Sequence, residues 1–347
     1  MSLSACITSV SGPSLLAEER AFLRDAQPWG VILMGRSCVS RAQVKKLTAD
    51  IKDALGRDAL IFIDQEGGRV ARLKSPEWPK FPAAGVYGEL FLHNPDTAIE
   101  ACQLGHRLMG HELFELGIQA DCAPCGDLRQ AETHDAIGDR SFGYSVDAVI
   151  ALTEAALSGL ADAGVAGVMK HMPGQGRAAS DTHYDLPSVA AGITTLVEDM
   201  SVFKALSDMV PMGMTCHVIF EAFDHDTPTT ISPTVISETI RKRIGFEGLL
   251  MTDDLGMEAL GGTLATRGAS ALAAGCDVLL HCSGFLKDPA EILAEMQEVA
   301  GAAGSLSGVS LERAKAVQSS IRTPVDFDAE TAWERFGALM SNMEASA

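Results

Sequence analysis

The chain has 347 residues, 47% of them hydrophobic, and a formal net charge of −19 at pH 7. This length accommodates one large α/β domain or two ordinary domains, and the apolar content suffices for a sizeable core. The acidic balance argues against nucleic acid or an anionic membrane surface as the main partner, because both require a basic protein face.

The first residues, Met1–Cys6, lack the basic region and long apolar core of a secretory signal peptide. No apolar stretch is long and uninterrupted enough to span a bilayer. Eight cysteines without a secretory signal predict reduced thiols. Cys122 and Cys125 form a C-x-x-C without a second such pair, which favours idle or buried thiols over a metal site. These features predict a cytoplasmic protein.

Eight short apolar runs predict strands, most of them continuous and therefore buried on both faces. In chain order they are Ala5–Ser11, Gly30–Met34, Ala59–Asp64, Gln119–Ala123, Val165–Lys170, Met212–Ile219, Gly248–Asp253 and Val278–His281. Helical patterns lie between them, among them Arg41–Leu55, Ala98–Leu116, Val146–Ala163 and Ser237–Arg243. The alternation predicts an α/β fold, a (β/α)8 barrel of the TIM type, with a doubly wound open sheet as the alternative.

No internal repeat and no linker divides the chain. We therefore expect residues 1–347 to form a single barrel domain, with the helices after about residue 285 packed outside it. Polar residues follow most of the predicted strands, and the carboxyl ends of barrel strands converge on one mouth. The sequence thus places a functional site at that mouth.

The first of these polar strand ends is Asp64–Arg69, which follows the strand Ala59–Ile63. A carboxylate at a strand end can accept hydrogen bonds from two hydroxyls of a sugar, although the paired glycines here also suit a plain turn. Arg140 lies further on, in a loop, Ile137–Gly143, whose order suggests either function or capping.

The segment from Lys170 to His183 is the most informative part of the chain. A strand ends there in a cation, an imidazole and a glycine-rich loop that closes with Asp181 and His183. A carboxylate bonded to one imidazole nitrogen raises basicity and leaves the other nitrogen for proton transfer. An ordinary exposed loop is the alternative. Lys170 itself suits either a Schiff-base lysine, as in barrel aldolases, or a donor to substrate hydroxyls.

Asp253 and Asp254 end another apolar run. Neighbours on an extended strand point to opposite sides, so one of the two is expected to face the mouth and the other to support the backbone. A helix N-cap is the alternative. With the loop above, this pair predicts a nucleophilic carboxylate and a separate proton-transfer group.

Four motifs occur together in chain order: Asp64–Val70, Ile137–Gly143, Lys170–Gly174 with Asp181–His183, and Thr252–Met257. In these motifs and their spacing the chain resembles the NagZ-type β-N-acetylglucosaminidases of glycoside hydrolase family 3, from Ser11 to the last strand. The resemblance implies a retaining β-N-acetylhexosaminidase that removes terminal N-acetylglucosamine from GlcNAc-1,6-anhydroMurNAc, with or without a peptide, in cytoplasmic peptidoglycan recycling.

The resemblance also implies residue roles. By position, Asp253 matches the nucleophile, His183 the acid/base and Asp181 the carboxylate that supports it. The matches to sugar-binding residues are Asp64, Arg72, Arg140, Lys170 and His171. We expect a monomer that binds a small-molecule sugar substrate, with no metal, organic cofactor, nucleic acid or membrane partner.

The chain departs from the family pattern at Gln175, where a histidine is usual, and at Arg177, where an acidic residue is frequent. Loop closure and the selectivity of the loop therefore stay open. A histidine acid/base avoids repulsion of anionic acceptors, so a β-N-acetylglucosaminide phosphorylase, with phosphate in place of water, remains an alternative. A Schiff-base aldolase using Lys170 and a non-catalytic sugar-binding barrel are more remote alternatives.

Overall fold

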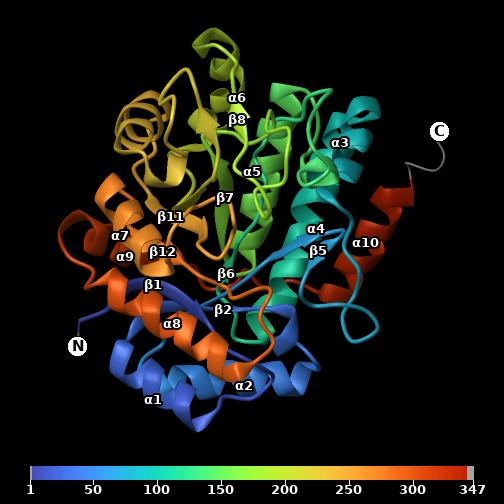
Figure 1. Ribbon diagram of the computed structural model, residues 1–347. Coiled ribbons are helices and arrows are strands. Elements are labelled where there is room, and N and C mark those ends of the chain that lie inside the picture. Colours follow the sequence, from blue (N-terminus) through green and yellow to red (C-terminus); the bar gives the residue numbers. More distant parts are fainter. Residues whose placement is uncertain (1, 342–347) are drawn as a thin grey trace.

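The computed structural model describes residues 2–341. Its centre is a closed barrel of parallel strands, arranged in sequence order and surrounded by helices (Figure 1). The barrel strands are β1 (Ser4–Ser9), β2 (Pro28–Leu33), β3 (Leu60–Ile63), β6 (Ala120–Asp121), β7 (Ala166–Met172), β9 (Met212–Thr215), β11 (Leu249–Asp254) and β12 (Val278–Leu280). Because β1 pairs with β12, the sheet has no open edge. The predicted (β/α)8 barrel is confirmed, and the open doubly wound sheet is excluded.

Each predicted strand overlaps one barrel strand, and the reason is burial. Every residue of β1, β2, β3, β7 and β9 is buried. Side chains on one face of each strand fill the barrel and those on the other pack under the helices. Both faces therefore need apolar residues, which produces the continuous runs in the sequence.

The outer layer consists mainly of α-helices. They are α1 (Ala17–Ala26), α2 (Arg41–Leu55), α3 (Ala84–His93), α4 (Pro95–Glu115), α5 (Val146–Asp162), α6 (Ile193–Leu206), α7 (Leu264–Ala274), α8 (Pro289–Ala303), α9 (Gly308–Ser320) and α10 (Ala329–Ser341), with short 3-10 turns η1 (Gly35–Ser37), η2 (Gly138–Arg140) and η3 (Thr229–Ile231). Between β9 and β11, η4 (Val235–Ile244) is wound as a π-helix. Within residues 2–341 no helix is both long and apolar enough to cross a membrane.

Helix α2 shows why some boundaries can be read from sequence. Ser40 accepts a hydrogen bond from the backbone N–H of Gln43, whose side chain caps back onto Ser40. At the other end Gly56 adopts a left-handed conformation, with φ 64°. A capping box and a C-terminal glycine together fix both ends of the helix.

One predicted strand was too long. The run Met212–Ile219 divides, since β9 ends at Thr215 and β10 (Ile219–Phe220) pairs instead with β8 (Ser188–Val189). Between them the ring of His217 is held at both nitrogens: Nδ1 lies 2.7 Å from Thr230 Oγ1 and Nε2 3.1 Å from the carbonyl oxygen of Asp254. These side-chain bonds turn the chain out of the barrel.

A small hairpin of β4 (Gln65–Gly67) and β5 (Val70–Ala71) stands at the end of β3. Gly67 has φ 89°, and a Cβ there would collide with the carbonyl oxygen of Pro82. The glycine pair therefore does form a tight turn, as one reading of the sequence proposed.

The last three helices lie outside the barrel. In Figure 1, α10 runs beside α4 and α8 lies below β1. Helix α8 also contacts α1, and α9 contacts β11.

Candidate active site

A cavity of about 420 Å³ is lined by residues from the carboxyl ends of the barrel strands and the loops that follow them. Segments far apart in the sequence contribute to it, as expected for a barrel mouth. The lining includes all eight residues predicted from the sequence: Asp64, Arg72, Arg140, Lys170, His171, Asp181, His183 and Asp253.

One part of this cavity is a network of charged side chains that lie on β4, β7 and η2 and directly after β3 and β5. The two Asp64 oxygens accept hydrogen bonds from Arg72 Nη2 at 2.9 Å and Lys170 Nζ at 3.3 Å. Glu66 receives a two-pronged contact from Arg140, with both distances 2.8 Å, and its Oε1 lies 2.6 Å from Lys170 Nζ. Two carboxylates and three cations are thus interleaved, which presents donors and acceptors side by side.

The network keeps its members charged. Burial alone would lower the pKa of Lys170, but Glu66 and Asp64 raise it above its ordinary value. Burial would raise the pKa of Glu66, yet Arg140 and Lys170 hold that pKa well below its usual range. An amine becomes a Schiff-base nucleophile only when it loses its proton. The setting of Lys170 therefore suits a cationic donor and argues against the aldolase reading.

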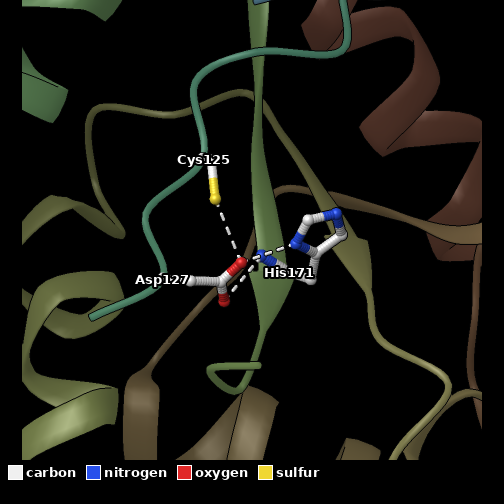
Figure 2. Close-up of side chains that lie close together, drawn as sticks. All are labelled: Cys125, Asp127 and His171. Carbon is white, nitrogen blue, oxygen red and sulfur yellow. Dashed lines mark hydrogen bonds and ion pairs between the residues drawn. The ribbon is translucent and has the colours of Figure 1, made fainter. Parts of the chain in front are cut away.

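His171 is oriented by a carboxylate that the sequence analysis missed. Figure 2 shows Asp127 between His171 and Cys125, with His171 Nδ1 2.6 Å from Asp127 Oδ2. Asp127 is fully buried, and its other oxygen accepts backbone N–H bonds from His171 at 3.3 Å and Gln175 at 2.6 Å. Burial would raise the pKa of Asp127, but the contacts with His171 lower it. Asp127 thus holds the Nδ1 edge of the ring, and Nε2 lies 3.4 Å from Arg140 Nη2.

Among residues 2–341, Cys125, Asp127 and His171 form a group of potential metal ligands whose ligand atoms lie within 4.8 Å of one another (Figure 2). Cys125 Sγ lies 3.1 Å from Asp127 Oδ2 as a hydrogen-bond donor. Ligands of a tetrahedral zinc ion stand roughly 3.3–3.8 Å apart, given its bond lengths. Burial also raises the pKa of the Cys125 thiol well above its usual value, which opposes the thiolate form. The spacing fits hydrogen bonds better than metal coordination.

At the end of β11, the two adjacent carboxylates have different surroundings. Asp253 Oδ1 accepts the backbone N–H of Asp254 at 2.8 Å. Asp254 Oδ1 accepts from the backbone N–H groups of Gly256 at 2.9 Å and Cys282 at 3.1 Å and lies 3.1 Å from His281 Nδ1. Asp254 therefore ties the end of β11 to the end of β12. Neither residue caps a helix, since the next one, α7, takes Thr263 as its N-cap.

His281 links Asp254 to the outer helix α8. Its Nε2 lies 3.0 Å from Glu295 Oε2, and its ring is fully buried. Burial would lower the pKa of His281, but the hydrogen bonds to Asp254 and Glu295 raise it to about 9. Burial likewise would raise the pKa of Asp254, while His281 and two backbone donors lower it to about 2. The pair is therefore charged at neutral pH.

The dyad of Asp181 and His183 lies on the loop after β7. Asp181 Oδ1 accepts both from the backbone N–H of His183 at 3.0 Å and, at 2.7 Å, from His183 Nδ1. The slight burial of Asp181 opposes ionisation, but these bonds from His183 lower its pKa. The side chain of His183 is 47% exposed. One carboxylate oxygen of Asp181 thus fixes both the ring and the backbone N–H of His183, although the His183 side chain is half exposed.

The two departures from the family pattern anchor this loop. Gln175 Nε2 donates to Thr182 Oγ1 at 3.4 Å, which joins the start of the loop to the residue before His183. Arg177 Nε donates to Asp199 Oδ2 of α6 at 2.6 Å. Burial raises the pKa of Asp199 to about 6, even against the attraction of Arg177.

Several lining or supporting residues were not singled out from the sequence: Glu66, Asp127, Glu295, Tyr184 and Phe285. Glu66 lies inside a motif that was already noted, so its position beside Asp64 was an available signal. Asp127 follows a predicted strand end by a few residues. Glu295 lies on an outer helix and carries no local signal.

Comparisons with known proteins place the whole chain among glycosyl hydrolases. Residues 7–318 match the glycosyl hydrolase family 3 N terminal domain. A beta-hexosaminidase of Alkalilimnicola ehrlichii is 37% identical over 287 residues, which make up 82% of each chain. The crystal structure of NagZ from Neisseria gonorrhoeae in complex with N-trifluoroacetyl-D-glucosamine has a TM-score of 0.81 at 28% identity, over 98% of this chain and 99% of that one. A family 3 β-N-acetylglucosaminidase from Paenibacillus sp. has a TM-score of 0.84 at 26% identity, over 96% of this chain and 66% of that one.

Proposed function

The chain belongs to family 3 of the glycosyl hydrolases, and on that premise we propose that this β-N-acetylhexosaminidase is a retaining exo-enzyme that releases terminal N-acetylglucosamine. The observation that carries the proposal is the meeting of Asp253, the Asp181–His183 dyad and the charged network in one cavity. A carboxylate and a supported imidazole supply the two groups that a double displacement requires.

In the first step, a carboxylate oxygen of Asp253 attacks the anomeric carbon as the bond to the leaving oxygen breaks. The backbone N–H of Asp254 donates to Asp253 Oδ1 and so fixes the rotation of the carboxylate. The product is a glycosyl-enzyme ester. In the second step water attacks the same carbon from the vacated face, which restores Asp253 and retains the configuration.

His183 moves the proton in both steps. Asp181 holds Nδ1, which leaves Nε2 to protonate the leaving oxygen and then to remove a proton from the attacking water. Most retaining glycosidases use a second carboxyl group here, and the dyad replaces it with an imidazole that a carboxylate supports.

The charged network recognises the terminal sugar. Asp64 retains acceptor capacity beyond its bonds to Arg72 and Lys170, and Lys170 and Arg140 supply donors. His171 adds its Nε2 edge beside Arg140. Alternating donors and acceptors on rigid strand ends match the vicinal hydroxyls of a pyranose.

We propose GlcNAc-1,6-anhydroMurNAc, free or peptide-linked, as the substrate, and peptidoglycan recycling in the cytoplasm as the setting. The N-trifluoroacetyl-D-glucosamine complex of the Neisseria relative supports the identity of the terminal sugar. The two-step geometry is also compatible with a phosphorylase.

Charge pairing favours water over phosphate as the acceptor. Among the described residues, the four Lys and Arg side chains that line the cavity each pair with a carboxylate: Arg69 with Asp139, Arg72 with Asp64, Arg140 with Glu66, and Lys170 with both Asp64 and Glu66. Recognition of a phosphate dianion is strongest where cations have no such partner.

The test is incubation with an aryl β-N-acetylglucosaminide, with and without phosphate, followed by product analysis. Free N-acetylglucosamine of β configuration in both reactions is the expected result. N-acetylglucosamine 1-phosphate as the main product would instead identify a phosphorylase. Absence of turnover, with substrate bound, would support a sugar-binding protein. Trapping of substrate on Lys170 by borohydride would revive the aldolase reading.

A further inference from the structure

The cavity lining also includes two aromatic side chains that are not part of the charged network. Tyr184 and Phe285 both line the cavity, yet 64% of Tyr184 and 60% of Phe285 is exposed. Large exposed rings that gather at one place on a surface mark a binding region more often than scattered apolar residues do. Because these two line the same cavity, the region belongs to the active site.

The rings surround the imidazole of His183. The ring centroid of Phe285 lies 6.0 Å from that of His183, edge to face, and the centroid of Tyr184 lies 6.4 Å from it. Tyr184 and Phe285 are themselves 6.5 Å apart. They come from different loops, Tyr184 from the loop after β7 and Phe285 from the loop after β12.

We propose that Tyr184 and Phe285 form an aromatic subsite that holds the leaving-group sugar. The inference rests on the proposed function, because a general acid must touch the oxygen that joins the two sugars. With Nδ1 of His183 held by Asp181, the leaving group must lie beside the opposite edge of the imidazole. Among the described residues, Tyr184 and Phe285 are the aromatic side chains that pair with the ring of His183.

The chemistry of a pyranose fits such a pair. Its axial C–H groups form an apolar face that packs on an aromatic ring, while its hydroxyls stay in water at the edge. The charged network instead suits the terminal sugar, which is enclosed. The cavity thus divides into a polar half for the sugar that is transferred and an aromatic half for the sugar that leaves.

The backbone near each ring is held by hydrogen bonds that do not involve the ring itself. The carbonyl oxygen of Ser283 accepts from Arg36 Nη1 at 3.0 Å, and the hydroxyl of Ser283 donates to Glu295. The backbone N–H of Tyr184 donates to the carbonyl oxygen of Asp181 at 3.0 Å. Removal of either ring therefore leaves the loops anchored, and the variants are expected to fold.

The experiment compares kcat/KM for two substrates with unactivated leaving groups, the β-1,4-linked disaccharide of N-acetylglucosamine and methyl β-N-acetylglucosaminide. Tyr184→Ala and Phe285→Ala are each expected to lower kcat/KM for the disaccharide by about tenfold, the scale of one ring contact. The value for the methyl glycoside should fall by no more than about twofold. Tyr184→Phe and Phe285→Tyr, which keep a ring, should restore most of the loss.

Val309→Ala, on α9 and 63% exposed, is the matched control for removing an exposed apolar side chain. Equal losses with both substrates, or an unchanged disaccharide reaction, would overturn the subsite. A wild-type enzyme that cleaves neither these two substrates nor an aryl β-N-acetylglucosaminide would instead contradict the proposed function itself.

Discussion

The two halves of the catalytic apparatus are built differently. Asp253 is the next-to-last residue of the barrel strand β11, and the last, Asp254, is held by two backbone donors and the fully buried His281. His183 lies on a long loop with its side chain 47% exposed, and a single carboxylate orients it. The attacking group is thus fixed by the fold, whereas the proton-transfer group is fixed by local hydrogen bonds.

The difference follows from what each group must do. A nucleophile must be held at one position and angle relative to the anomeric carbon, and a residue on a rigid strand meets this requirement. An acid/base serves a leaving sugar in one step and water in the next, so it must remain accessible from solvent. Substitutions on the strand side should therefore disturb chemistry or folding severely, and those on the loop side should act in a graded way.

The largest effect should come from Asp253→Ala. Loss of the nucleophile should reduce kcat by about 10⁴-fold or more, as for other residues that form a covalent intermediate. The melting temperature should stay near that of wild type, because within residues 2–341 the Asp253 side chain makes one hydrogen bond, to the backbone N–H of Asp254, and lines the cavity. Asp254→Ala is the matched control at the neighbouring position. Unlike Asp253→Ala, it should lower the melting temperature in addition to the rate. Thermal melts together with initial rates separate the two.

His183→Ala should come next, with a loss that depends on the leaving group. For a disaccharide kcat/KM should fall about 10²- to 10⁴-fold, the usual contribution of general acid catalysis. For an aryl glycoside whose leaving group needs no proton, the loss should be far smaller. Asp181→Ala should follow the same trend more mildly. A series of aryl glycosides of graded leaving-group pKa checks this, and equal losses across the series would exclude His183 as the acid.

His281→Gln probes the support of the strand side through stability and pH. The folded-state pKa of His281, about 9, lies above its ordinary 6.5, so its contribution is complete below pH 6.5 and disappears as pH rises through 9. The pKa of Asp254, about 2, lies below its ordinary 3.8, so that contribution disappears as pH falls through 2.

The wild-type advantage in free energy of unfolding should accordingly be about 3–5 kcal/mol between pH 4 and 6.5, the usual cost of breaking a buried pair. It should shrink as pH rises from 6.5 and be lost above about pH 9. Denaturant unfolding of wild type and variant across this range is the measurement. An advantage independent of pH would show that packing, and not the charged pair, supports β11.

The smallest effects should come from the loop anchors. Arg177→Ala and Gln175→Ala should each lower kcat/KM about three- to tenfold, because they loosen the loop without touching the sugar. Since the pKa of Asp199 is about 6, the partner of Arg177 is charged only above that pH. The penalty of Arg177→Ala should thus be present above pH 6 and decline below it. A pH–rate profile of both variants checks this, and Gln175→Ala, which removes no charge, is the control.

The features of the fold and site that could be predicted from the sequence share one property: each is marked by a pattern in its own stretch of sequence. Buried strands appear as apolar runs, and α2 carries its own caps, so their positions could be read directly. Asp64, Lys170 and Asp253 stand at strand ends, and strand ends in a barrel must converge. Their meeting in one cavity follows from the fold alone.

The parts that could not be predicted depend on tertiary contacts. Asp127 orients His171 from 44 positions away in the sequence. Glu295 supports His281 from an outer helix, α8, with its own side chain 32% exposed. The strand assigned to Met212–Ile219 was too long because His217 bonds to Thr230, which no local pattern reveals. Gln175 is a departure from the family pattern that left loop closure open in the sequence, and its bond to Thr182 is visible only in the structure.

The central claim is that Asp253, and not its neighbour Asp254, forms the covalent bond to the sugar. The most direct test is to trap the intermediate with a 5-fluoro or 2-fluoro glycosyl reagent, digest the enzyme and locate the label by mass spectrometry. We expect one equivalent of label on Asp253 and none on the Asp253→Ala variant. A label on Asp254, or hydrolysis of the reagent with no covalent adduct on the enzyme, would contradict the assignment of Asp253 as the nucleophile.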